Sequence, residues 1–143
     1  MLSKQANHAL KALLEMAAEP ERWLSTHELA IAQQLPEPML EQILLRLRRA
    51  GVLVARRGRR GGYRLACSPG ELSLAAVLIG LGEAVGARGQ TETTATDKVT
   101  GALERSLDRA QLQALEELRL EDLLFDLRSA EAGATSEAGL LLG

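Results

Sequence analysis

The stretch RLRRAGVLVARRGRRGGYR, residues 46–64, decides how the whole chain can be interpreted. It contains eight arginines and no acidic residue, and no carboxylate occurs from Gln42 to Gly70. The arginines surround a helix end, an apolar run and a glycine-rich turn, so the charge belongs to a folded element rather than to a tail. Polyanionic phosphate is its natural counterpart, because each neutralised phosphate releases condensed counterions. The alternative is a solvated basic face.

Composition favours a helical protein. The 143 residues fit one domain, or a domain with a dimerisation appendage. Hydrophobic residues make up 46% of the chain but aromatic residues only 2%, so the core must be built from Leu, Ala, Ile and Val. The sequence has no long apolar run and no signal-peptide pattern, which predicts a cytoplasmic protein with no membrane partner. A single cysteine, Cys67, excludes an intrachain disulfide and an all-cysteine metal site.

The formal net charge of −2 is unevenly distributed. Residues 1–70 carry eleven Lys/Arg against six Asp/Glu, whereas residues 71–143 carry six against thirteen. Nucleic acid would attract the first half and repel the second half. This division predicts a reading domain and a body held away from the duplex.

Two helices are expected before the arginine-rich stretch. Residues 3–18 have apolar side chains at spacings of three and four, and Pro20 ends this pattern. A short second helix is expected from Ser25 to about Gln34, where Ser25 and Glu28 can form a reciprocal capping box.

A third helix leads into the stretch itself. Residues 35–38 hold two prolines and are expected to form a rigid turn before it. The helix should end at Ala50, because Gly51 suits the position that follows a helix end. Its core side is expected to be Leu40, Ile43, Leu44 and Leu47. Helix, tight turn and helix with a polar outer face is the layout of a helix-turn-helix.

A β-hairpin is expected directly after this third helix. Residues 52–54 and 63–65 have strand character, and the loop over 56–62 is glycine-punctuated with an arginine-coated tip. Such a hairpin after a recognition-type helix is a wing. The predicted fold is therefore mainly α with a small β-hairpin wing, and residues 1–70 form the winged helix-turn-helix domain.

Residues 71–128 are expected to form a linker and a helical dimerisation region. A helix over 72–86 and a polar linker over 86–96 precede a long helix over 97–117. The apolar stripe of the long helix is Val99, Leu103, Leu107, Ala110 and Ala114.

A short helix over 121–128 should follow, with Leu120, Leu123, Leu124 and Leu127 on its buried side. So much leucine favours self-association of the chain as a homodimer, and the alternative is packing onto the chain's own winged domain. Residues 129–143 are expected to be a flexible tail.

Three groups of residues resemble the Rrf2 type (IscR/NsrR/CymR-like) of winged helix-turn-helix transcriptional regulator. They are Leu40-Glu41-Gln42, Leu47-Arg48-Arg49-Ala50-Gly51, and Arg57-Gly58 followed by Gly61-Gly62-Tyr63-Arg64-Leu65. The resemblance covers residues 1–85 well and 98–125 more loosely. It implies a homodimer on double-stranded DNA, with the third helix in the major groove and the wing in the minor groove.

The resemblance also implies particular contacts. Glu41 can accept from a cytosine amino group, Gln42 can pair with adenine, and Arg57 becomes the minor-groove residue. Two positions depart from the family pattern: Arg59 and Arg60 replace proline and glycine, and Pro38 stands where a serine is common. The predicted DNA-binding residues are Ser25, Thr26, Pro38, Met39, Glu41, Gln42, Arg49, Arg57, Gly58, Arg59, Arg60, Gly61, Gly62 and Tyr63.

No cofactor is expected. Cluster-binding members of the family carry three cysteines in the segment that here reads as the polar linker, and this segment has none. Cys67 is interpreted as a small hydrophobic residue and His8 as a partly exposed helix residue, with a sensing role for either left open.

The predicted function is a DNA-binding transcriptional regulator, by analogy a repressor. The alternative is a winged-helix module that binds an acidic protein partner. An enzyme is excluded, because His8 and His27 lack a neighbouring nucleophile and no phosphate-cradling loop occurs. The operator and the inducing signal cannot be read from the chain.

Overall fold

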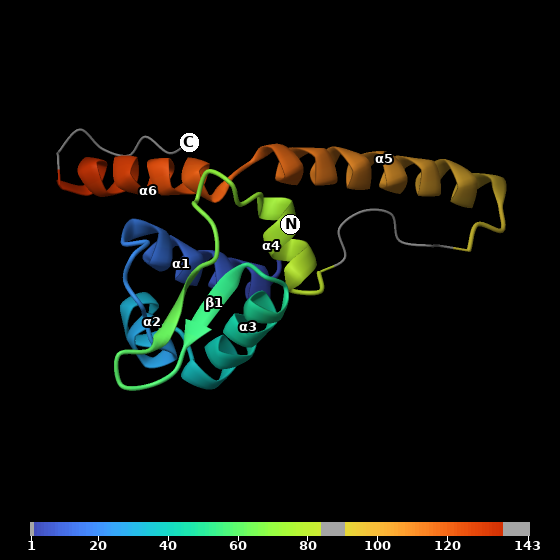
Figure 1. Cartoon of the computed structure of the whole chain (residues 1–143). Helices are drawn as coiled ribbons and strands as arrows, with labels where there is room; N and C mark the ends of the chain where they lie inside the picture. The colour runs from blue at the N-terminus through green and yellow to red at the C-terminus, as the bar shows by residue number, and fades with distance from the viewer. Residues whose placement is uncertain (1, 84–90, 136–143) are drawn as a thin grey trace.

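The fold is a computed structural model that describes residues 2–83 and 91–135. Six helices and one two-stranded antiparallel sheet make up this part of the chain (Figure 1). The elements are α1 Lys4–Ala18, α2 Thr26–Gln33, α3 Glu37–Arg49, β1 Leu53–Arg56, β2 Gly62–Leu65, α4 Leu74–Gly80, α5 Ala95–Glu117 and α6 Leu120–Thr135. The winged helix-turn-helix prediction is confirmed. None of the described helices has the length and apolar character that crossing a membrane requires.

The core is built around α1, which packs against α2, α3 and α6. Leu13 and Met16 of α1 and Leu40, Leu44 and Leu47 of α3 are fully buried. The apolar spacing of three and four explains this, since it places one stripe of each helix against the other. Fully burying one leucine stabilises the fold by about 1.5–3 kcal/mol, so the helix-turn-helix rests on aliphatic packing.

The starts of α2 and α3 each differ from expectation in one detail. Ser25 accepts a hydrogen bond from the Glu28 N–H at 3.1 Å, but the Glu28 carboxylate pairs with Arg22 instead of completing the capping box. The third helix begins at Glu37, so Pro38 lies in its first turn rather than before it. Proline is tolerated there because the first N–H groups of a helix have no partner within it.

The wing is anchored to the body of the domain through its second strand. Leu53 pairs with Leu65 and Arg56 with Gly62, so both strands are longer than expected. Tyr63 exchanges two backbone hydrogen bonds with Leu24, at 3.0 and 2.8 Å. Gly62 has a φ of +143°, and a Cβ at this position would collide with the Leu24 backbone. Only glycine therefore allows this close approach.

A short backbone pairing joins α4 to the junction of α5 and α6. Leu74 N–H donates to Leu118 O, and Leu120 N–H donates to Leu72 O, both at 2.9 Å. The predicted helix over 72–86 is shorter in the structure, where α4 ends at Gly80. Residues 84–90 lie outside the described part of the chain.

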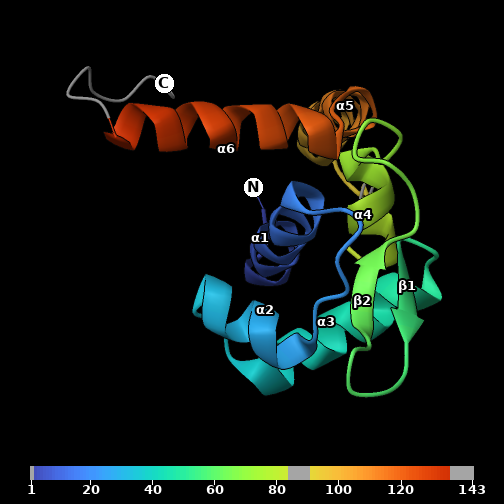
Figure 2. The same ribbon diagram turned by 60° about the vertical axis from the view of Figure 1, so that its left-hand side comes forward.

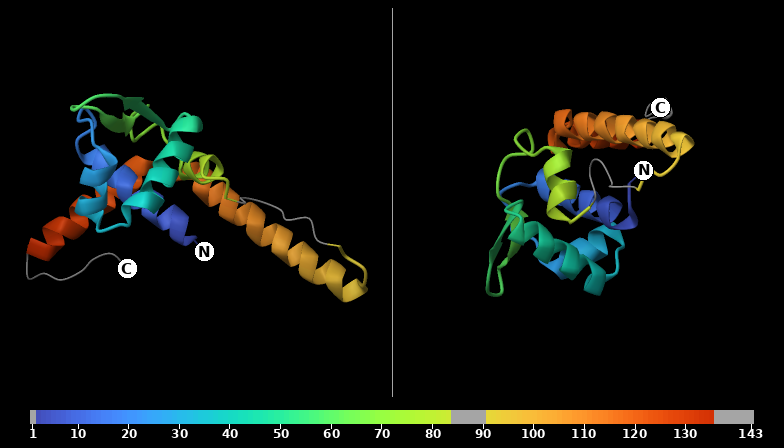
Figure 3. Two further views of the ribbon diagram at one scale, coloured as in Figure 1. Left: turned by 90° about the horizontal axis from the view of Figure 1, so that it is seen from below. Right: turned by 90° about the vertical axis from the view of Figure 1, so that its right-hand side faces the viewer.

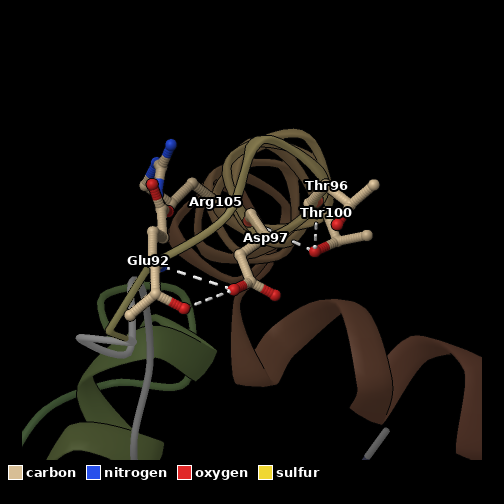
Figure 4. A network of polar contacts seen from close by, with 6 residues as sticks. Glu92, Thr96, Asp97, Thr100 and Arg105 are labelled. Carbon is tan, nitrogen blue, oxygen red and sulfur yellow. Dashed lines mark hydrogen bonds and ion pairs between the residues drawn. The ribbon is translucent and has the colours of Figure 1, made fainter.

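The long helix α5 begins earlier than expected, inside the predicted linker. Thr94 and Asp97 form a complete capping box. The side-chain hydrogen bond from Thr93, followed by the hydrogen bonds from Thr94, lowers the pKa of the Asp97 carboxyl. Glu92, just before the helix, forms an ion pair with Arg105 of α5 (Figure 4). The cap explains why the helix starts at Ala95 in spite of its polar threonines.

The two C-terminal helices diverge from their junction beside α4 (Figure 3). α6 lies over α1 (Figure 2), and its Leu120 and Leu124 are buried there. For α6, packing onto the chain's own domain is therefore the correct alternative. The helix continues to Thr135, beyond its expected end at residue 128 and into the segment expected to be a flexible tail. Residues 136–143, with the Leu140–Leu142 run, lie outside the described part.

The stripe of α5 has a different environment. Val99 is 72% exposed, and Leu103 and Leu107 are each 60% exposed. The N-terminal half of α5 projects away from the winged domain, on the side opposite α3 and the wing (Figure 1). These side chains have no cover within the described chain.

Candidate nucleic-acid interface

The outer face of α3 is polar and open. Pro38, Glu41, Gln42 and Arg49 lie on the side of the helix opposite its buried leucines, as a period of 3.6 residues requires. All four are exposed, and no side-chain hydrogen bond engages Glu41 or Gln42 within the described residues. Met39 is the exception among the predicted contacts on α3, because its half-buried side chain packs against the core.

The N-terminal ends of α2 and α3 lie close together. His27 Nδ1 and Glu37 Oε2 are 3.0 Å apart and join the two helices across the turn. Ser25 and Thr26 are half-buried at the start of α2. Ser25 uses its oxygen as an acceptor for the cap, so its hydroxyl hydrogen is still available to a phosphate. The His27–Glu37 contact was not expected from the sequence.

The tip of the wing is a tight turn closed by a hydrogen bond from Gly61 N–H to Gly58 O at 3.0 Å. Arg57, Arg59 and Arg60 are exposed at this tip. A Cβ at Gly61 would collide with the Arg56 backbone, which explains the glycine. The turn thus presents three guanidinium groups on a short, glycine-shaped loop.

Two of the residues predicted to contact DNA, Gly62 and Tyr63, have contacts that are mainly structural. The Tyr63 side chain is half-buried and packs against the core, while its backbone holds Leu24. Gly62 abuts the same Leu24 backbone. These residues join the wing to the domain.

Trp23 is a feature that the sequence interpretation missed. Its indole ring lies under two guanidinium groups, with the Cζ atoms of Arg56 and Arg64 at 4.7 and 4.3 Å from the ring centroid. The available signal was a single tryptophan two residues before the helix cap, in a chain rich in arginine.

The eight arginines of the stretch therefore fall into two groups. Arg46 donates to Gln5 of α1, and Arg56 and Arg64 stack on Trp23. Within the described chain, no ion pair or side-chain hydrogen bond engages the remaining five, which are Arg48, Arg49, Arg57, Arg59 and Arg60. These five carry positive charge on α3 and the wing without internal compensation. The guanidinium groups of the wing tip are solvent-exposed, as a phosphate-binding surface requires.

The residues that could hold a metal do not converge. Burial, and secondly Glu71, raise the pKa of the Cys67 thiol, which disfavours the thiolate that metals bind. The pKa of His8 is lowered by burial and by the nearby Lys4 and Lys11. No group of three His, Cys, Asp or Glu side chains capable of metal binding occurs among the described residues. The undescribed segment 84–90 contains none of these four residue types. The donor set thus does not fit an iron–sulfur cluster.

A helix-turn-helix with an open polar helix and a cationic wing defines the class of winged-helix transcriptional regulators. A family model described as Rrf2, iron-dependent transcriptional regulator, matches residues 2–126, and the chain belongs to the Rrf2 family. The resemblance inferred from the sequence motifs is confirmed.

Known relatives agree with this assignment. An HTH-type transcriptional regulator of Synechocystis sp. is 38% identical over 135 residues, with 92% of each chain covered. The HTH-type transcriptional regulator IscR of Cereibacter sphaeroides is 29% identical over 133 residues, with 86% of each covered.

Solved structures are similar over most of the chain. The global cysteine regulator CymR of B. subtilis has a TM-score of 0.76 at 25% identity, covering 87% of this chain and 96% of its own. T. potens IscR has a TM-score of 0.67 at 26% identity, covering 100% and 93%. The chain is thus a transcriptional regulator and not an enzyme.

Proposed function

We propose that the chain is a sequence-specific DNA-binding regulator that acts as a homodimer. The observation that carries this proposal is the set of uncompensated arginines on α3 and the wing, beside the exposed polar face of α3. A surface of this kind gains affinity by releasing counterions from phosphate and can read bases from one helix.

Within this proposal, α3 enters the major groove. Glu41 would accept from a cytosine amino group, and Gln42 would pair with an adenine edge. Both side chains are exposed on the same helix face as Pro38 and Arg49. Ser25 and Thr26, at the start of α2, would contact the backbone phosphates that fix the position of α3.

The wing is proposed to enter the adjacent minor groove. Arg57 would be inserted there, where a narrow groove deepens the negative potential. Arg59 and Arg60 replace a proline and a glycine common in the family and would add phosphate contacts. The turn closed by Gly58 and Gly61 holds all three side chains at one tip.

Self-association is proposed through the exposed stripe of α5. Val99, Leu103 and Leu107 recur every four residues, and all are largely exposed within one chain. Covering them with a second copy removes apolar area from water and places two reading surfaces on one duplex. A dimer of this kind would bind two half-sites about 34–36 Å apart.

The proposed regulator works in the cytoplasm, represses transcription and carries no iron–sulfur cluster. The last point is supported by the single cysteine per chain and by the scattered donors described above. Protein purified without oxygen should therefore lack visible absorbance and contain no stoichiometric iron or sulfide. A brown sample with bound iron and sulfide would contradict this part of the proposal.

The central test is the affinity for duplex DNA as a function of salt concentration. A palindromic duplex selected from a randomised pool should bind with an affinity that falls steeply as salt increases. Arg57→Ala combined with Arg60→Ala should abolish binding at physiological salt. Unchanged binding by this double variant would remove the proposal. An adaptor for an acidic protein is not favoured, because the family and its relatives are transcriptional regulators.

A further inference from the structure

The starting point is the position of Trp23 at the base of the wing. It lies between α1 and α2, directly before Leu24, which exchanges two backbone hydrogen bonds with Tyr63 of β2. The residue directly after Trp23 is therefore hydrogen-bonded to the wing through its backbone. The indole is half-buried and faces the hairpin.

Both strands of the wing place an arginine over this ring. Arg56 of β1 pairs with Gly62, and Arg64 of β2 pairs with Val54, so the two arginines are diagonal neighbours on one face of the hairpin. Their Cζ atoms lie 4.7 and 4.3 Å from the ring centroid. Both distances are within the range of about 6 Å in which an aromatic ring attracts a cation.

The Arg56 guanidinium has a second partner at the wing tip. Its Nη2 donates to the carbonyl oxygen of Arg60 at 2.6 Å. A continuous set of contacts therefore runs from Trp23 through Arg56 to the turn that carries Arg57, Arg59 and Arg60. Arg56 is occupied by these contacts, whereas the three tip side chains are not.

Such a contact matters because the turn is rich in glycine. Gly58 has a φ of +103°, and Gly61 and Gly62 follow shortly after, so the free loop would sample many conformations. Each conformation lost on binding reduces the affinity, and a loop held in advance avoids that loss. Holding the turn is therefore a way to increase affinity without an additional contact to DNA.

We propose that Trp23 is a positioning residue for duplex binding, which holds the wing tip in its binding conformation by stacking on Arg56. This inference rests on the proposed DNA-binding function. It gives different roles to four arginines of the wing: Arg57, Arg59 and Arg60 contact the duplex, while Arg56 connects Trp23 to the turn.

The two roles differ in their salt dependence. Arg59→Ala removes one phosphate contact and should reduce the slope of log affinity against log salt by about 0.9 per wing. Trp23→Leu keeps an apolar but smaller side chain and removes the π face, and should weaken binding about fivefold at every salt concentration without changing the slope. Trp23→Phe should recover part of the loss, because its ring still attracts a cation.

The experiment uses the full chain and a fixed random-sequence duplex, so no operator is needed. Arg56→Lys keeps the charge but loses the planar guanidinium, and its effect should not add to that of Trp23→Leu. Trp23 is the only tryptophan of the chain, so intrinsic fluorescence reports on it alone. Without DNA, acrylamide quenching of Trp23 should increase in Arg56→Ala, a surface variant that leaves the core untouched.

Each result decides the question. Unchanged acrylamide quenching in Arg56→Ala would overturn the proposed contact, regardless of the affinity measured for the duplex. Wild-type affinity in Trp23→Leu, or a reduced salt slope, would overturn the positioning role while the DNA-binding proposal stands. If the wild-type protein does not bind the duplex at low salt, the proposed function is wrong, and the positioning role is wrong with it.

Discussion

Two exposed surfaces on opposite sides of the molecule differ in whether contact with water is favourable. The surface of α3 and the wing carries five arginines that no side chain of the described residues pairs with, and hydration stabilises it until a polyanion replaces the water. The stripe of α5 carries Val99, Leu103 and Leu107, and water destabilises its exposure. The charged surface therefore suits a reversible partner, whereas the apolar stripe suits a permanent one.

The largest expected effect comes from placing charge on the apolar stripe. Leu103→Glu combined with Leu107→Glu should dissociate the dimer, because each of four leucines in the pair loses about 1.5–3 kcal/mol of burial and like charges meet. Sedimentation velocity should show monomers, and far-UV circular dichroism should show an unchanged helix content. A dimer that persists would mean that another surface joins the copies.

A leucine that the chain itself covers provides the contrast. Leu124 of α6 is 6% exposed against α1, so Leu124→Ala should reduce the free energy of unfolding by about 2–4 kcal/mol. Chemical denaturation measures this loss. The same experiment on Leu103→Ala, at a concentration where the protein is monomeric, should give a change near zero.

The charged surface can be divided in the same way into base readers and phosphate contacts. Replacing Glu41 and Gln42 by Ala should cost about 1–3 kcal/mol of discrimination for each base pair read. The slope of affinity against salt should not decrease, because neither side chain neutralises a phosphate. Competition between the selected duplex and a random duplex measures both quantities. Preserved preference for the selected duplex would mean that other side chains read the bases.

The smallest effect tests the turn that presents α3. Gln34 ends α2 with a φ of +54°, a left-handed conformation that glycine adopts more easily. Gln34→Gly should stabilise the fold by only about 0.5 kcal/mol, because glycine also gains entropy in the unfolded chain. Thermal unfolding measures the shift, and affinity for DNA should be unchanged. A loss of stability would show that the Gln34 side chain contributes more than its backbone conformation costs.

The features predicted correctly from the sequence are those with local causes. The leucines of α3 and the glycine at position 51 specify where that helix faces and ends. In the structure Ala50 is the C-cap and Gly51 follows it, with its N–H donating to Arg48 O. Glu41, Gln42 and Arg57, which are proposed to contact DNA, are all exposed. The start of α5 was placed too late, because the capping bond between Thr94 and Asp97 outweighed a composition typical of a loop.

The amino-acid sequence by itself determined the helices, the glycine turn of the wing and the concentration of positive charge, since periodicity and charge are properties of neighbouring residues. Only the tertiary structure decided which arginines are free, because stacking on Trp23 and the bond from Arg46 to Gln5 join residues far apart in the chain. It also decided that Leu120 and Leu124 of α6 are buried, whereas Leu103 and Leu107 of α5 are exposed. Both helices have apolar stripes, and only the position of α1 in space distinguishes them.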